Sequence, residues 1–167
     1  EDGLKDYLAE GVKGYTVLPE SPYTGEFSAE TEAANWALLW QPEGGEMITE
    51  SYVNLIPTSQ GGTHVNGLRQ GLLDAMREFC EFRNLLPRGV KLTGDDVFER
   101  CSYVLSVKMQ DPQFAGQTKE RLSSRQTAAF VSGVVKDAFS LWLNEKPQLA
   151  EQLAEICIAN AHRRMRA

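Results

Sequence analysis

The chain has 167 residues, of which 42% are hydrophobic and 24% are charged, and its formal net charge is −6. These values are ordinary for one soluble domain that is long enough to bury a real core. This negative net charge disfavours a protein that binds nucleic acid through an overall positive charge. A local basic face on one side of the domain is still compatible with the composition.

A short amphipathic helix is expected first, from Gly3 to about Gly11. The segment that follows contains Pro19, Pro22 and Gly25, which are residues that break regular structure. The beginning of the chain is therefore predicted to contribute one helix and then a loop.

Two strands are predicted next. Residues Glu32 to Gln41 alternate in polarity, and one side of that strand carries Ala34, Trp36, Leu38 and Trp40. Residues Met47 to Ile56 are rich in β-branched and aromatic side chains, and a Pro-Glu-Gly-Gly turn separates the two segments. The two strands are predicted to pair as an antiparallel hairpin.

A long helix is predicted from Thr63, as its N-cap, to about Leu86. Apolar residues recur along it at spacings of three and four, which predicts one buried stripe. Gly67 and Gly71 lie one turn apart, and each glycine lowers helix stability by roughly 1 kcal/mol. Either another element approaches closely at these two positions, or the long helix simply tolerates them.

The remaining elements are a short helix capped at Thr93, a strand from Tyr103 to Met109, a helix from the capping box Ser123-Ser124-Arg125-Gln126 to about Asn144, and a helix from Pro147 onward. Few strands and several long helices in mixed order predict an α/β or α+β two-layer sandwich. One domain is expected over residues 1–167.

Cysteine and histidine give no sign of a metal site. Cys80, Cys101 and Cys157 are far apart and lie in apolar patterns, so we expect buried, reduced, inert thiols. Asp95 and Asp96 are predicted to be helix-start charges, because a carboxylate pair alone lacks the further ligands of a cation. No apolar run approaches the length of a membrane span, and the termini suggest a fragment of a larger cytoplasmic protein.

Gln117-Thr118-Lys119 is the most informative tripeptide of the sequence. It follows a strongly apolar strand and a loop that contains Pro112 and Gly116, so the loop tip carries an amide and an ammonium group. Lysine is a common phosphate ligand. On spacing alone, however, a solvated loop lysine is the more ordinary interpretation.

Two linked signatures change this balance. Gly61-Gly62-Thr63-His64 opens the long helix, and about 50 residues later Asp111-Pro112-Gln113-Phe114 precedes Gly116-Gln117-Thr118-Lys119. Together they resemble the transducer domain of the B subunits of bacterial type II DNA topoisomerases, from Asp2-Gly3 to Arg164. The segments 51–58 and 121–126 are more similar to the topoisomerase IV branch than to the gyrase branch.

The resemblance implies a fold and a role. The fold is a left-handed βαβ unit that is shared with a ribosomal protein domain. The domain lies between an ATPase domain of the GHKL class, missing upstream, and a TOPRIM cleavage domain, missing downstream. Gln117 and Lys119 are implied to contact the γ-phosphate of ATP in the preceding domain, with Lys119 as the catalytic group that stabilises the transition state.

The resemblance also implies partners. They are the A subunit of topoisomerase IV, double-stranded DNA and a second copy of the B subunit, with no membrane, in the cytoplasm of a bacterium. Arg69 is the position most similar to the basic residues that face DNA in the family, although a solvated helix charge is the more ordinary interpretation. ATP and Mg are the cofactors implied for the full-length enzyme, which performs strand passage, decatenation and relaxation. The fragment alone is expected to bind and hydrolyse no ATP.

Two other functions remain open. One is the transducer of the gyrase B subunit. The other is a non-catalytic interaction module, which would dock a partner through the face of Trp36 and Trp40 and the helix of Gly67 and Gly71. His64 is predicted to be a structural hydrogen-bonding residue, because no spacing indicates a nucleophile or carboxylate partner.

Overall fold

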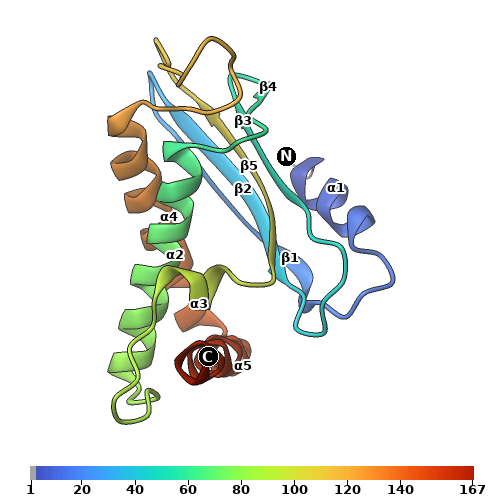
Figure 1. Ribbon diagram of the computed structural model, residues 1–167, viewed down its shortest axis with the longest axis vertical. Helices are drawn as coiled ribbons and strands as arrows, with labels where there is room; N and C mark the ends of the chain where they lie inside the picture. Colours follow the sequence, from blue (N-terminus) through green and yellow to red (C-terminus); the bar gives the residue numbers. More distant parts are fainter. Residues whose placement is uncertain (1–2) are drawn as a thin grey trace.

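The computed structural model describes residues 3–167, so Glu1 and Asp2, which the resemblance and the predicted domain include, lie outside the described residues. The described chain forms one five-stranded sheet in the order β1-β2-β5-β3-β4 and five helices (Figure 1). The elements are α1 (Gly3–Gly11), β1 (Leu18–Ser28), β2 (Ala33–Trp40), β3 (Thr49–Val53), β4 (Ile56–Pro57), α2 (Thr63–Phe82), α3 (Gly94–Phe98), β5 (Cys101–Lys108), α4 (Arg125–Glu145) and α5 (Pro147–Arg166).

The helices cover the sheet unequally. The long helices α2 and α4 pack side by side on one face, and α1 lies on the other face (Figure 1). The loop between β5 and α4 stands at one end of the long axis of the molecule, and α5 with the C-terminus stands at the opposite end. This layered arrangement confirms the predicted mixed α/β class.

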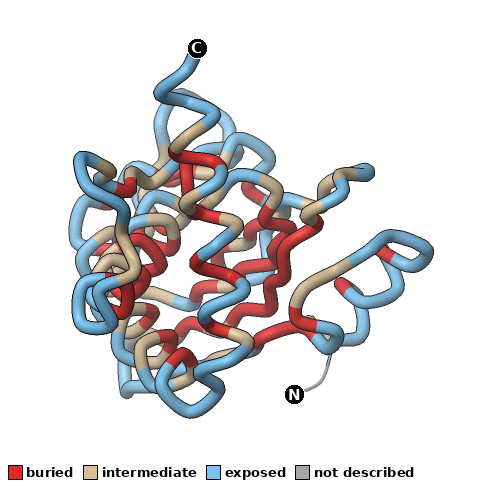
Figure 2. Tube along the Cα trace, turned by 90° about the horizontal axis from the view of Figure 1, so that it is seen from below, coloured by how far each residue is buried: buried red, intermediate tan, exposed pale blue. Residues whose placement is uncertain are grey.

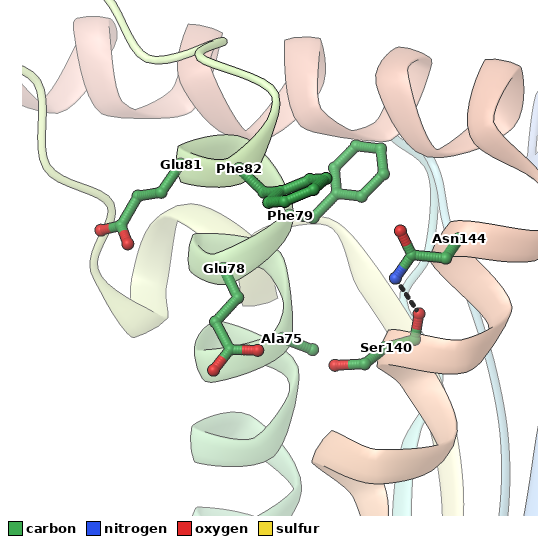
Figure 3. A pocket seen from close by; sticks show the side chains of 7 residues that line it. All are labelled: Ala75, Glu78, Phe79, Glu81, Phe82, Ser140 and Asn144. Carbon is green, nitrogen blue, oxygen red and sulfur yellow. Dashed lines mark hydrogen bonds between the residues drawn. The ribbon is translucent and has the colours of Figure 1, made fainter.

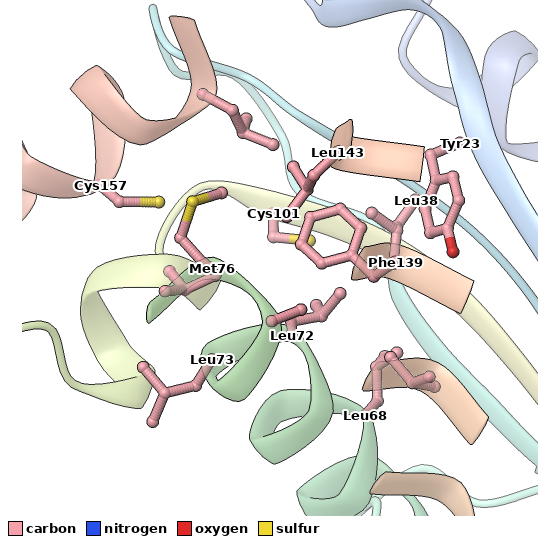
Figure 4. Close-up of a cluster of buried hydrophobic side chains, with 14 of the residues drawn as sticks. Tyr23, Leu38, Leu68, Leu72, Leu73, Met76, Cys101, Phe139, Leu143 and Cys157 are labelled. Atoms are coloured by element: carbon pink, nitrogen blue, oxygen red, sulfur yellow. The ribbon is translucent and has the colours of Figure 1, made fainter. Parts of the chain in front are cut away.

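The core lies between the sheet and the α2–α4 layer, and it extends to α5 (Figure 4). The strands β2 and β5 are buried along most of their length, as Figure 2 shows for the centre of the sheet. Trp36 and Trp40 are 1% and 0% exposed, and the indole Nε1–H of Trp40 donates to the carbonyl of Val97 at 2.7 Å. The interaction module that would use these tryptophans as a docking face is therefore wrong.

The first strand, β1, lies where a loop was predicted. It pairs antiparallel with β2, with Tyr23 opposite Leu38, and its register shifts between Leu18 and Tyr23. Pro19 and Pro22 both fall within that irregular stretch. Proline is tolerated on an edge strand and at a bulge because no ladder hydrogen bond is needed from its nitrogen there.

The predicted hairpin of the second and third segments is also wrong. Strand β3 pairs parallel with β5, with Ser51 beside Leu105, while β5 pairs antiparallel with β2. The true hairpin is therefore β1–β2, and β5 is inserted between β2 and β3. A parallel pair requires a crossover, which α2 and α3 provide.

At Gly67 and Gly71, α2 and α4 approach each other closely. A Cβ atom on Gly67 would lie 2.7 Å from the carbonyl oxygen of Ala128, and one on Gly71 would lie 2.7 Å from that of Ser132. Of the two alternatives that the sequence left open at these glycines, the structure shows the close approach of another element. It also removes this helix face from the surface that the interaction module needed.

Two predicted caps differ from the structure. Gly62, not Thr63, is the N-cap residue of α2, and Thr63 is the first helical residue. The hydroxyl of Ser124 does not cap α4 but accepts a hydrogen bond from the backbone N–H of Gln113 at 2.8 Å. The backbone N–H of Thr63 and the hydroxyl of Ser124 both bond to the loop that joins β5 to α4.

Candidate functional site

Gln117 and Lys119 lie on the exposed tip of the loop that joins β5 to α4. Within the described chain, Lys119 forms no salt bridge. An exposed ammonium group without an internal carboxylate partner is free to meet an external anion. The two predicted site residues therefore share one exposed tip.

The base of this loop is fastened to the start of α2. The N–H of Leu122 donates to the carbonyl of Gly61 at 3.0 Å, and the N–H of Thr63 donates to the carbonyl of Leu122 at 3.0 Å. A third bond joins the N–H of Gln60 to the carbonyl of Glu120 at 2.8 Å. The two motifs that carry the resemblance are thus one structural unit.

Gly62 lies at the closest point of this unit. Its φ is +135°, and a Cβ atom there would lie 2.3 Å from the carbonyl oxygen of Leu122. Only glycine combines this backbone conformation with so close an approach. The second glycine of the Gly-Gly pair is therefore explained by its close contact with the loop base.

The loop closes on itself above this base. The N–H of Ala115 donates to the carbonyl of Arg121 at 2.9 Å, and the N–H of Ser123 donates to that of Gln113 at 2.8 Å. Five residues, 116–120, project beyond these closures, and they include both site residues. A short tip on a closed base can present two donors in a limited range of positions.

His64 is fully buried in the first turn of α2, two residues after Gly62. Its Nε2 lies 3.0 Å from the hydroxyl of Thr58, which lies 2.7 Å from the hydroxyl of Ser51 on β3. Burial lowers the pKa of His64 to about 4, so its ring is neutral near pH 7. Within residues 3–167 its only side-chain hydrogen bond is to the hydroxyl of Thr58, which is itself buried, and no carboxylate is bonded to it. This agrees with the predicted structural role; sequence reasoning missed Ser51 and Thr58.

The buried ring of His64 makes the stability of the fold depend on acid. Its pKa is lowered in the folded state from 6.5 to about 4, so the unfolded chain binds more protons between these two values. The contribution of the neutral His64 ring to the free energy of unfolding is complete above pH 6.5 and is lost as the pH falls towards 4. We expect urea unfolding midpoints to fall over this window in the wild type and to fall less in His64→Gln. Parallel profiles for the two proteins would contradict this assignment.

Arg69 is engaged in an internal ion pair. Its guanidinium contacts the carboxylate of Asp95 on α3 and lies 5.9 Å from the ring centre of Phe98. Its side chain is still 40% exposed. Arg69 therefore joins α2 to α3 while part of its surface stays accessible.

A second ion pair joins α3 to the C-terminal helix. The guanidinium of Arg164 donates to both carboxylate oxygens of Asp96, at 2.8 and 3.0 Å. Burial alone would raise the pKa of Asp96, but hydrogen bonds from Arg164 and Thr93 lower it overall. Asp95 and Asp96 thus serve as helix-start charges and as partners of arginine, as predicted in the first respect.

An open groove of about 560 Å³ lies at the far end of α2, between α2 and α4 (Figure 3). Phe82 and Glu78 stand on one side, and Asn144 bonds to the carbonyl of Ser140 in its own helix on the other. The groove contains neither Gln117 nor Lys119. Its lining shows no pair of groups that is arranged for acid–base or nucleophilic chemistry.

The thiols and acidic groups offer no metal site within residues 3–167, where no cluster of three or more His, Cys, Asp or Glu side chains could hold an ion. The three cysteines are buried and free, as predicted. Burial raises the pKa of the Cys80 thiol to about 11, and it raises those of Cys101 and Cys157 as well. None of the helices described is long and apolar enough to cross a membrane.

Comparison with known proteins shows which family the chain is similar to. Residues 3–167 match the family described as DNA gyrase B. The B subunit of DNA topoisomerase 4 from Salmonella typhimurium is 77% identical over 167 residues, and that from Escherichia coli is 75% identical. The match covers 100% of this chain but 26% of each relative, so the chain spans about a quarter of their length.

Two solved structures are similar in fold as well as in sequence. The topoisomerase IV ATP-binding domain of Francisella tularensis is 40% identical with a TM-score of 0.87, and the match covers 99% of this chain and 44% of that one. The 43K ATPase domain of Thermus thermophilus gyrase B is 26% identical with a TM-score of 0.87, over 98% and 44% of the two chains. More than half of each of those chains lies outside the matched region.

Proposed function

Because the chain belongs to the DNA gyrase B family, we propose that it is the transducer module of a type II DNA topoisomerase, in the B subunit of the topoisomerase IV kind. It would sense the γ-phosphate of ATP that is bound in the preceding GHKL domain and couple hydrolysis to strand passage. The observation that carries this proposal is the exposed Gln117–Lys119 tip on a base that is hydrogen-bonded to the start of α2.

Lys119 and Gln117 fit one end of a nucleotide. The ammonium group has no internal partner within the described chain, and a lysine that touches a transferring phosphoryl group stabilises the charge of its transition state. Gln117 would add a neutral donor beside it. ATP would supply the terminal phosphoryl group, while its base, its ribose and its magnesium ion would be held by the neighbouring domain.

The packing behind the loop supports a role in transmitting movement. The base is joined to α2, and α2 packs tightly against α4 through Gly67 and Gly71. Between these two glycines in the sequence of α2, Arg69 joins α2 to α3. The pair of Asp96 and Arg164 then joins α3 to α5.

A loop that binds the γ-phosphate makes this contact before ATP hydrolysis and loses it afterwards. The difference in binding free energy between the two states can bias a domain rotation. The chain of contacts from the loop base to α5 would carry the movement towards the cleavage domain. We therefore place α5 on the side of the DNA-cleaving core and the Gln117–Lys119 tip on the side of the ATPase domain.

The identity of the relatives favours topoisomerase IV over gyrase for this module, since the two topoisomerase 4 relatives are 75 to 77% identical to it. The partners that we propose are the A subunit, a second copy of the B subunit, and double-stranded DNA, in the bacterial cytoplasm. ATP and Mg would be the cofactors of the full-length protein.

The proposal is tested by strand passage. The full-length protein, combined with ATP and the A subunit, should decatenate linked DNA circles, and the Lys119→Ala variant should not. Decatenation by the Lys119→Ala variant at the wild-type rate would contradict the proposal. ATP-dependent introduction of negative supercoils would instead favour the gyrase alternative.

We also propose that the exposed part of Arg69 faces DNA, through phosphate contact without sequence readout. Arg69→Ala in the full-length enzyme is expected to lower the ratio of DNA-stimulated to unstimulated ATP turnover several-fold. Arg83→Ala is the matched control. Arg83 is the C-cap residue of α2 and, like Arg69, forms a salt bridge, in its case with Glu151 at 3.3 Å. An equal loss in both variants, or in neither, would remove Arg69 from the DNA-facing set.

A further inference from the structure

The hydrogen bonds of His64 fix one tautomer of its ring. The hydroxyl of Ser51 donates to the carbonyl of Thr58 at 3.2 Å, so the hydroxyl of Thr58 is free to donate to the oxygen of Ser51 at 2.7 Å. The oxygen of Thr58 is then the acceptor for an Nε2–H of His64 at 3.0 Å. The opposite arrangement would leave a buried Nδ1–H with no acceptor, and an unpartnered buried donor is costly.

Thr58 connects this ring to the loop base. Its N–H donates to the carbonyl of Ser51 at 2.8 Å, and its carbonyl accepts from the N–H of Gly61 at 2.9 Å. The carbonyl of Gly61 in turn accepts from Leu122. One turn, 58–62, is therefore hydrogen-bonded both to the ring of His64 and to the base of the Gln117–Lys119 loop.

Simple filling of space does not account for an imidazole at this position. Nδ1 is buried without a hydrogen-bond partner within the described chain, so the ring leaves one polar atom unsatisfied. An apolar side chain of similar size would fill the same volume without that cost. What the imidazole adds is the single bond to Thr58.

We propose that His64 is a positioning residue for Lys119, which acts through Thr58 and through the backbone bonds that join residues 60–63 to residues 120–122. This inference rests on the proposed function, since it concerns how accurately the ammonium group is presented. The ring does not contact the nucleotide. It holds the turn to which the loop base is hydrogen-bonded.

The experiment compares three variants of the full-length protein. His64→Ala removes the donor, and His64→Gln keeps an N–H near the position of Nε2. Leu73→Ala is the control, because Leu73 is a buried residue of the same helix that packs in the main core. Two readouts are measured in each: amide hydrogen exchange of peptides that span residues 110–124, and kcat and KM for ATP.

His64→Ala should speed exchange at residues 120–123 about tenfold and lower kcat about tenfold, with little change in KM. His64→Gln should restore both towards the wild type. Leu73→Ala should lower the unfolding temperature but leave both readouts near wild-type values at 25 °C.

Wild-type exchange in His64→Ala, or equal acceleration in Leu73→Ala, would overturn the inference. Faster exchange with an unchanged kcat would also overturn it, because the loop would then be loosened without consequence for the chemistry. If Lys119→Ala keeps full turnover, the proposed function itself fails, and the exchange result still decides whether His64 holds the loop base.

Discussion

Replacing Lys119 with alanine in the full-length protein should lower the rate of ATP hydrolysis about 100-fold, because loss of one donor to a developing anionic charge has effects of this size. Lys119 is exposed at the tip of its loop and has no internal carboxylate partner within the described chain. Its removal should therefore leave the fold intact. The effect should fall mainly on kcat, with nucleotide binding kept in part, since the rest of the nucleotide is held by another domain.

The matched control is Lys13→Ala, which removes another exposed lysine, beyond the end of α1. Steady-state ATP hydrolysis is measured for both variants with DNA and the A subunit present. We expect Lys13→Ala to hydrolyse ATP at the wild-type rate. Turnover of Lys119→Ala within a factor of two or three of wild type would show that this lysine does not serve the chemistry.

Replacing Gly62 with alanine should give the largest loss of stability. Its φ of +135° is strained for any residue with a side chain, and the new Cβ would lie 2.3 Å from the carbonyl oxygen of Leu122. Backbone strain and overpacking together should lower the free energy of unfolding by roughly 2 to 4 kcal/mol. Urea denaturation of the chain measures this change, and the bonds to the loop base should weaken with it.

Gly133→Ala provides the opposite control. Gly133 lies in the interior of α4, and a Cβ there would meet no atom within 4 Å. Alanine at this position should stabilise the chain by about 0.5 to 1 kcal/mol, because glycine is a poor helix former. If Gly62→Ala were as stable as the wild type, the close packing of the Gly-Gly pair on the loop base would be refuted.

The helices could be predicted well from the sequence, because apolar residues recur along each of them at spacings of three and four. That repeat can be recognised within one segment, without knowledge of the rest of the fold. The one-turn spacing of Gly67 and Gly71 raised a close approach of another element as one of two alternatives, and the structure decided between them. Helix ends were less certain, since Gly62 packs against Leu122, which is far along the chain, and the hydroxyl of Ser124 bonds to Gln113 in the preceding loop. Residue preferences at helix N-caps depend only on neighbouring residues, so they cannot predict contacts with residues outside the helix.

Strand pairing could not be read from local patterns. The turn at residues 42–45 has the composition of a hairpin, yet β5, more than 50 residues further on, is the strand that pairs with both β2 and β3. The edge strand β1 was hidden by its prolines, which a bulged edge tolerates. Non-local pairing of this kind depends on the whole sheet.

The candidate site was predicted in part. Gln117 and Lys119 were identified from their motif and are exposed as expected. The hydrogen bonds between residues 60–63 and 120–122 were not predicted, although the two motifs were recognised as linked. Nothing in the sequence indicated that Ser51 and Thr58 would bond to His64, because hydroxyl residues near a turn are common and His64 lies in another element.

The most direct test measures whether Lys119 is shielded by the terminal phosphate. The full-length protein is treated with an amine-acetylating reagent in the presence of a non-hydrolysable ATP analogue or of ADP, and modification of each lysine is quantified by mass spectrometry. We predict that Lys119 reacts about tenfold more slowly with the triphosphate than with ADP, because an ammonium group that is bound to an anion is a poor nucleophile. Lys13 should react equally in both states. Equal reactivity of Lys119 with the two nucleotides would contradict the account.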